Sequence, residues 1–138
     1  MEHTPELESI DEEECLQLLG AQSLGRLAVV NDDQPLILPL NYCLQDRQVV
    51  FRTASGGNLQ RATLSKVAFE VDEYDPASGV GWSVLIQGVL REITDAIDPR
   101  SEALRQLKVE PLAPGERERW LTVHPVQITG RRFQGVGG

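Results

Sequence analysis

The chain has 138 residues, the size of one ordinary domain built around a single hydrophobic core. Its 13 basic and 21 acidic residues give a net charge of −8. This charge argues against nucleic acid or a membrane surface as a partner, because both are negatively charged and bind positively charged protein surfaces. Two cysteines, an acidic N-terminus and the lack of a long apolar run predict a cytoplasmic, soluble protein without a disulfide framework. We expect one domain over residues 1–138, with residues 1–8 flexible and no metal site.

The first predicted helix follows the acidic N-terminal segment. Ser9 and Asp11 are both candidate N-caps, because a glutamate follows each of them three residues later. Apolar residues such as Cys15 and Leu19 fall on one face of this helix, and Gly20 suits its end. The helix must therefore lie against an apolar surface.

Three β-rich runs come next, separated by short polar turns. They cover residues 25–30, 35–44 and 48–53, a pattern typical of an antiparallel meander. Pro35 and Pro39 lie in the second run. Since proline cannot donate a hydrogen bond to a neighbouring strand, we expect this strand to border an opening or a kink.

The rest of the chain predicts further helices and strands. The helices cover residues 58–66 and 98–107, and the strands cover residues 67–75, 82–93 and 120–133. Gly88 interrupts the long strand, where we expect a bulge or a close backbone approach. His124 and Pro125 predict a break in the last strand, which makes it one strand or a pair. Strands joined by short turns, with a few small helices, predict a mainly β, partly closed antiparallel barrel.

No set of catalytic side chains can be picked out from the sequence. The serines lack a nucleophile elbow, and the glycines do not form the usual phosphate-binding motifs of nucleotide-binding proteins. A hydrolase with a nucleophile and a base is therefore not expected.

The segment VVFRTASGGNLQRA, residues 49–62, changes abruptly from a strand to small polar residues. Arg52, Thr53, Ser55 and Asn58, together with the glycine backbone, offer a guanidinium, hydroxyls and amide donors. Such a set suits a phosphate monoester. A plain loop beside a helix cap has the same composition, so both interpretations stay open for this segment alone.

Two neighbouring features favour a ligand. Asn41 and Tyr42 end the adjacent strand, and Trp82 and Ser83 follow a glycine turn. An aromatic ring in that position can cover the face of a flat molecule. Each residue alone also fits an ordinary core or strand role, but together they predict a flat, polar-edged ligand with a phosphate tail.

The pieces PLNY at residues 39–42, FRTA at 51–54 and GWSV at 81–84 occur in a characteristic order. In this order the chain resembles the FMN-binding split β-barrel proteins of the pyridoxamine 5′-phosphate oxidase-like family, in its nitroimidazole-resistance-type branch. The likeness runs from about residue 16 to residue 133. It implies an antiparallel split β-barrel with small α helices, and a homodimer with FMN between the subunits.

The resemblance also implies where the cofactor lies. In the family, the segment matching 39–42 borders the flavin ring, the segment matching 51–54 contacts the ring edge and phosphate, and the segment matching 82–84 comes near the flavin. Many relatives have a lysine at Asn58, so an arginine, Arg52 or Arg61, would have to supply the missing charge. The implied cofactor-binding residues are Pro39, Leu40, Asn41, Tyr42, Phe51, Arg52, Thr53, Ala54, Asn58, Trp82, Ser83 and Val84.

The activity that the resemblance implies is that of an FMN-dependent oxidoreductase, which passes electrons from NAD(P)H to a small organic substrate. In such a protein the cofactor supplies the chemistry, so the lack of a catalytic acid and base is no objection. Two alternatives stay open: a flavin-binding module that stores or senses the cofactor without turnover, and a family member that uses a deazaflavin or haem. The departure at Asn58 keeps the last alternative open.

Overall fold

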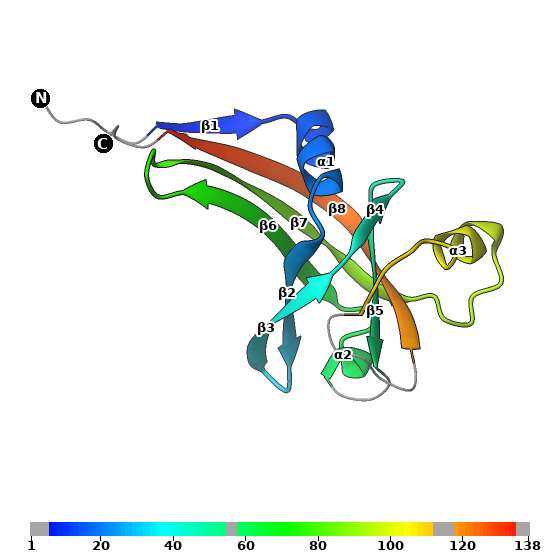
Figure 1. The fold of residues 1–138 in the computed structure, drawn as a ribbon. Helices are drawn as coiled ribbons and strands as arrows, with labels where there is room; N and C mark the ends of the chain where they lie inside the picture. Colours follow the sequence, from blue (N-terminus) through cyan, green and yellow to red (C-terminus); the bar gives the residue numbers. More distant parts are fainter. Residues whose placement is uncertain (1–5, 55–57, 112–117, 135–138) are drawn as a thin grey trace, which may run out of the picture.

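The computed structural model describes residues 6–54, 58–111 and 118–134. Its strands all belong to one antiparallel sheet in the order β3-β2-β6-β7-β8-β5-β4, with β1 beside β8 (Figure 1). The predicted mainly β, antiparallel fold is confirmed. In chain order the elements are β1 (Glu6–Ile10), α1 (Glu12–Gly20), β2 (Leu24–Asn31), β3 (Gln34–Asn41), β4 (Cys43–Gln45), β5 (Gln48–Ala54), α2 (Asn58–Arg61), β6 (Lys66–Asp75), β7 (Val80–Glu92), α3 (Pro99–Leu104) and β8 (Glu118–Gln134).

The sheet curls into a half-barrel because the chain passes directly from one of its edges to the other. β3 and β4 lie at opposite ends of the strand order, yet Tyr42 alone separates them. The predicted single strand over residues 35–44 is therefore wrong: its first part pairs with β2, and its last part pairs with β5. Pro35 and Pro39 are tolerated because β3 is an edge strand. This position agrees with the prediction that the strand with the two prolines borders an opening.

Alternate residues of the strands fill the interior of the half-barrel, with α1 across one end (Figure 1). Phe51 and Phe69 are fully buried there, and Cys15 and Leu19 of α1 pack into the same core. The side chain of Asp11 accepts a hydrogen bond from the backbone N–H of Glu14 at 2.9 Å, so Asp11 is the N-cap of this helix. The burial of one face of α1 against the barrel agrees with the predicted amphipathic helix.

The N-terminal strand β1 was not predicted from the sequence. Residues 6–10 pair with residues 130–134 at the end of β8, so Ser9 lies in a strand and the alternative cap there is wrong. Of the segment 1–8 that we expect to be flexible, residues 6–8 belong to this pairing, and residues 1–5 lie outside the described residues. This segment contains two apolar residues, of which Leu7 is exposed and Ile10 is buried. It forms a strand because the far end of the chain offers it a partner, which no local pattern reveals.

β8 is one continuous strand of 17 residues rather than a pair of strands. The register shifts between Gln87 and Gly88, where Val126 is the extra residue of a β-bulge. A Cβ atom on Gly88 would lie 2.2 Å from the carbonyl oxygen of His124, so a side chain would force the two backbones apart. The predicted bulge and close approach at Gly88 are confirmed, and the break expected at residues 124–125 is this bulge.

Both later helices are shorter than predicted. α2 has four residues, and Leu64 adopts a φ of 69° soon after its end, a conformation that no helix continues through. α3 has six residues and begins as expected, with Asp98 accepting a hydrogen bond from the N–H of Ser101 at 3.0 Å. The Arg105 guanidinium beyond it donates to the carbonyl oxygens of Ile93 and Ala96, which fixes the approach to α3.

The outer face of the sheet, which points away from the barrel interior, has two unlike halves. Outer-face residues of β4, β5 and the start of β8 lie beneath the segment 93–111, and we call this region the covered half. α1 and α2 pack into the inner core, so none of the described helices lies on the outer face of β3, β2, β6, β7 and the rest of β8, which we call the open half. Exposed apolar side chains on the open half are Leu24, Val30, Ile37 and Val126.

Candidate functional site

The predicted cofactor residues lie near opposite ends of β8. Arg52 pairs with Trp120 and Trp82 pairs with Arg132, twelve residues further along the strand. At roughly 3.3 Å per residue this is a path of about 40 Å along the strand. The segment 51–54 and the segment 82–84 of one chain therefore do not meet around one small ligand.

The other two predicted pieces do come together. β3, which ends with residues 39–41, contacts β5, which ends with residues 51–54, across the open side of the half-barrel. Asn58 begins α2, which packs against the neighbouring strand β2. The structure thus assembles one group from β3, β5 and α2 and leaves a second group at the start of β7.

Burial divides the predicted residues into two kinds. Leu40, Tyr42, Phe51 and Val84 are at most 8% exposed and belong to the inner core, so they can reach a surface ligand only through their backbone. The side chains of Ala54 and Asn58 lie outside the described part of the structure. The side chains with at least part of their surface exposed are Pro39, Asn41, Arg52, Thr53, Trp82 and Ser83.

Tyr42 links the helix α1 to the barrel. Its hydroxyl donates a hydrogen bond to the carbonyl oxygen of Leu19 at 2.5 Å, and its ring meets the Phe69 ring edge-on with the centroids 5.0 Å apart. Burial raises the pKa of Tyr42, so the phenol is neutral and stays a donor. Its hydroxyl therefore serves the fold, where sequence reasoning assigns it to the flavin ring.

Arg52 lies on the covered half. Its Nη1 donates to the carbonyl oxygen of Val109 at 2.8 Å, and its Cζ lies 5.1 Å from the centroid of the Trp120 ring. Arg61, the other arginine that could replace a lysine, forms an exposed ion pair of 2.9 Å with Asp32 in the turn between β2 and β3. Both arginines thus bind other parts of the chain.

The second group, around Trp82, borders a hollow of about 320 Å³ at the β6–β7 hairpin. Arg132 forms an ion pair with Glu14 of α1, and this hydrogen bond lowers the pKa of Glu14. The indole of Trp82, with the Arg132 guanidinium on the paired residue of β8, can stack on a flat molecule. The hollow is lined by Glu73, Tyr74, Asp75, Val80, Gly81, Trp82 and Arg132.

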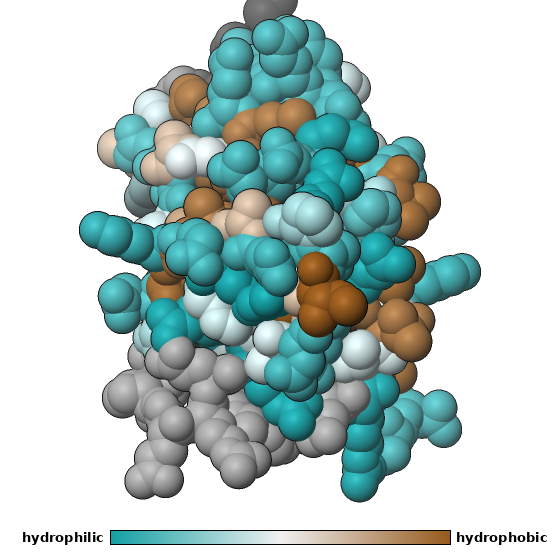
Figure 2. Space-filling view, turned by 90° about the vertical axis from the view of Figure 1, so that its right-hand side faces the viewer, coloured by the Kyte–Doolittle hydropathy of each residue, from teal (hydrophilic) through white to brown (hydrophobic). Residues whose placement is uncertain are grey.

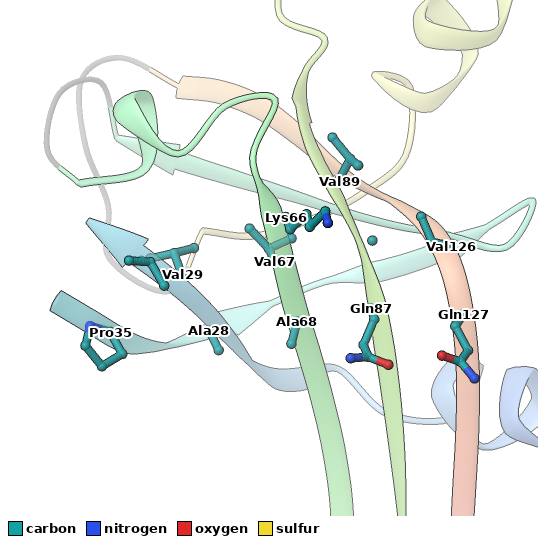
Figure 3. A pocket seen from close by; sticks show the side chains of 12 residues that line it. Ala28, Val29, Pro35, Lys66, Val67, Ala68, Gln87, Val89, Val126 and Gln127 are labelled. Carbon is teal, nitrogen blue, oxygen red and sulfur yellow. The ribbon is translucent and has the colours of Figure 1, made fainter. Parts of the chain in front are cut away.

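A larger groove of about 520 Å³ lies on the open half, and the sequence did not indicate it (Figure 3). It crosses β2, β6, β7 and β8 beside the bulge, where Val126 turns outward and is 74% exposed. The bulge at Gly88 is the sequence signal that could have pointed here, since bulges redirect side chains. The lining residues are Ala28, Val29, Val30, Pro35, Lys66, Val67, Ala68, Gln87, Gly88, Val89, Val126 and Gln127.

Three charged residues cluster elsewhere on the open half. One nitrogen of Arg26, Nη1, lies 3.3 Å from Glu70 Oε1 and 3.2 Å from Asp72 Oδ2. Burial, then the hydrogen bond and charge of Asp72, raise the pKa of Glu70 to about 7, against the pull of Arg26. One guanidinium nitrogen cannot fully compensate two carboxylates, so this cluster takes up a proton near neutral pH.

The described residues form neither a cluster of metal-ligating side chains nor a membrane-spanning helix. No three His, Cys, Asp or Glu side chains there are grouped so that they could hold a metal ion. None of the described helices is both long and apolar enough to cross a membrane.

The curled antiparallel sheet, with its edges joined at Tyr42, defines a split β-barrel, as the resemblance predicts. A family model described as pyridoxamine 5′-phosphate oxidase matches residues 11–132. The chain therefore belongs to the pyridoxamine 5′-phosphate oxidase family.

Individual relatives agree with this assignment. A solved structure described as the FAD binding protein from Mycobacterium smegmatis is 36% identical, with a TM-score of 0.78 over 92% of this chain and 100% of that one. An FAD-binding protein from Mesorhizobium loti is 22% identical and shares the fold, with a TM-score of 0.78 over 96% of this chain and 100% of that one. An uncharacterized protein of Mycobacterium tuberculosis is 29% identical over 93% of this chain and 86% of its own length.

Proposed function

We propose that this protein is a homodimeric flavoprotein that holds FMN, or the related FAD, at the subunit interface and passes electrons from NAD(P)H to a small organic substrate. The observation that carries the proposal is the 36% identity, over 92% of the chain, to a protein described as binding FAD. The family assignment over residues 11–132 supports the same cofactor class.

The available side chains suit a flavin. Asn41, Thr53 and Ser83 offer an amide and two hydroxyls with part of their surface exposed, and Trp82 offers an aromatic face. Hydrogen-bond donors and acceptors of this kind match the polar edge of a flavin ring, and the indole suits its flat face. The core residues Leu40 and Phe51 hold the strands whose backbone groups would complete the site.

Separation of the two groups supports a site shared between two chains. Since the segments 51–54 and 82–84 lie near opposite ends of β8, one copy can contribute the first segment and its partner the second. The open half supports the same dimer, because it exposes apolar residues and lacks the excess of negative charge that gives the whole chain its net charge of −8. The charged residues of this face are Arg26, Lys66, Glu70, Asp72, Arg91 and Arg131.

When bound, a flavin accepts and donates hydride equivalents, so the protein need not supply a nucleophile or a base. The task of this chain is to orient the ring, exclude water from it and leave room for a substrate. Trp82 and the backbone of residues 39–42 would set the orientation. The buried core beneath β3 and β5 would keep those positions rigid.

The visible absorption spectrum of the purified protein tests the proposal. We expect a flavin spectrum, or its appearance with saturable binding when FMN or FAD is added, and parallel titrations decide between the two. A colourless preparation that binds neither compound would overturn the proposal.

A threonine variant tests the assigned position. Thr53→Val removes one hydroxyl from the proposed site at nearly constant volume. Loss of one hydrogen bond should weaken flavin binding by roughly threefold to tenfold relative to the parent. An unchanged affinity in Thr53→Val would place the cofactor away from β5.

Storage or sensing of the flavin is a second candidate, favoured by the description of the M. smegmatis relative as a binding protein. Anaerobic mixing of the flavin-loaded protein with NADH or NADPH separates the two functions. Bleaching of the flavin by either donor supports the oxidoreductase. A stable oxidised spectrum with both donors favours storage or sensing.

A further inference from the structure

The groove of about 520 Å³ on the open half has a chemistry that the proposed flavin site does not explain (Figure 3). None of its lining residues is among those assigned to the flavin. Its walls are mostly apolar, with Ala28, Val30, Pro35, Val89 and Val126 among them. Such a surface favours a ligand with a large apolar part.

The polar groups of the groove come from adjacent strands. Gln87 and Gln127 are register partners on β7 and β8, and their amide ends lie side by side in Figure 3. In the described part of the chain, neither amide makes a side-chain hydrogen bond. The pair can therefore offer both donors and acceptors to a bound molecule.

Lys66 carries the charge of the groove. Of its twelve lining residues, Lys66 is the one that is charged, and no carboxylate of the described residues lies within 4.0 Å of its ammonium. The charge stands out because the chain as a whole has a net charge of −8. A cation without a partner, set in an apolar groove, attracts an anionic group of a ligand.

We propose that this groove binds a planar organic anion, with its anionic group at Lys66, its polar edge at Gln87 and Gln127, and its apolar part against Val30 and Val126. Aromatic carboxylates are the simplest members of this class. The proposal stands apart from flavin binding, because the two sets of residues do not overlap. A second copy placed on the open half would close the groove on its solvent side.

Calorimetric titration with 2-naphthoate tests the proposal on the full-length protein, with and without saturating flavin. The neutral analogue 2-naphthamide has the same ring system and is the matched ligand control. We expect saturable binding of 2-naphthoate at one site per chain and at least about tenfold weaker binding of 2-naphthamide. No binding of 2-naphthoate, or equal affinity for both compounds, would overturn the proposal.

Two lysine variants locate the site. Lys66→Met removes the charge of the groove, and Lys108→Met makes the same change on the exposed segment over the covered half. Lys66→Met should weaken 2-naphthoate binding by about tenfold or more and leave 2-naphthamide unaffected, while Lys108→Met should bind as the parent does. An unchanged affinity in Lys66→Met overturns the proposal. So does failure of the dimer to bind 2-naphthoate, which would mean that side chains of a second copy fill the groove.

The flavin titration is read separately in these variants. If neither flavin binds while 2-naphthoate still depends on Lys66, the groove proposal stands and the proposed function fails. If flavin binds and 2-naphthoate does not, the proposed function stands and the groove proposal fails.

Discussion

The covered and open halves of the outer face belong to the same sheet, yet they differ in what lies over them. On the covered half, Val50 packs with Ile93 and Leu104 beneath α3, and Arg52 binds the segment that follows α3. On the open half, Ile37 and Val126 are 68% and 74% exposed. The molecular surface on the side where α3 lies is mostly hydrophilic (Figure 2). Local contacts thus complete one half, while the other keeps apolar surface available for a partner or ligand.

A pair of truncations should show this difference most strongly. Leu104→Ala removes a side chain that is 3% exposed beneath α3, and Ile37→Ala removes one that is 68% exposed on the open half. We expect Leu104→Ala to lower the free energy of unfolding by about 2 to 4 kcal/mol, because it leaves a cavity, and Ile37→Ala to lower it by less than about 0.5 kcal/mol. Denaturant titration of both variants measures this, and similar losses would mean that α3 contributes little packing.

Alanine variants of one arginine on each half compare how much the polar contacts of the covered half and of the open half stabilise the fold. Arg52→Ala removes the hydrogen bond to the Val109 carbonyl and the contact with the Trp120 ring, and should cost about 1.5 to 3 kcal/mol of unfolding free energy. Arg26→Ala removes contacts of a side chain that is 53% exposed, and should cost less than about 1 kcal/mol. The measurement is made without flavin, so that binding does not enter. A smaller loss in Arg52→Ala than in Arg26→Ala would show that the segment after α3 is not held by Arg52.

The sequence reveals the elements that depend on local contacts and not those that depend on distant ones. Periodicity predicts β2, β5, β6 and β7, because each has a clear buried face, and the cap at Asp11 gives α1. The strand β1 and the division between β3 and β4 depend on pairing with distant segments: residues 130–134 in one case, and β2 and β5 in the other. Local pattern carries no information about such partners.

For the candidate site, the order of short segments identifies the family but not the role of each side chain. Tyr42 and Phe51 lie in the segments predicted to border the cofactor, yet their side chains belong to the core. Arg52 looks like an anion ligand in the sequence, and its contacts with Val109 and Trp120 depend on the segment after α3, which folds back from far along the chain. The sequence does not reveal the groove at Lys66, because its lining comes from five strands and only the bulge beside Gly88 is visible locally.

If the open half forms the dimer contact, a charge placed there should weaken association. Ile37→Glu puts a carboxylate on the open half, and Ile97→Glu puts one on an isoleucine that is 89% exposed near α3. We expect the dimer dissociation constant to rise by about tenfold or more in Ile37→Glu and to stay unchanged in Ile97→Glu, because burial of an unpaired charge is unfavourable. Analytical ultracentrifugation over a concentration series measures this. An unaltered dimer in Ile37→Glu, or weakening in Ile97→Glu alone, would move the contact away from the open half.

The smallest expected effect concerns protons on the open half. The pKa of Glu70 is about 7 in the folded chain, above the usual 4.5, so the folded state holds a proton that the unfolded state releases. The contribution of Glu70 to stability is therefore greatest below about pH 4.5 and declines as the pH rises to about 7. Near pH 5, Glu70→Gln should have the same melting temperature as the parent. Near pH 8 its melting temperature should be slightly higher, which corresponds to a gain of less than about 1 kcal/mol in the free energy of unfolding, because the cluster is partly exposed.

Asp72→Asn sharpens this test, because it keeps Glu70 and removes the second carboxylate beside the guanidinium of Arg26. Without that neighbour the pKa of Glu70 should fall towards its usual range, so Asp72→Asn should also lessen the decline in stability between about pH 5 and pH 8. Thermal unfolding of the parent and both variants across this range gives the comparison. If all three chains show the same pH dependence, Arg26 already satisfies both carboxylates, and the open half carries no proton-sensitive group at this cluster.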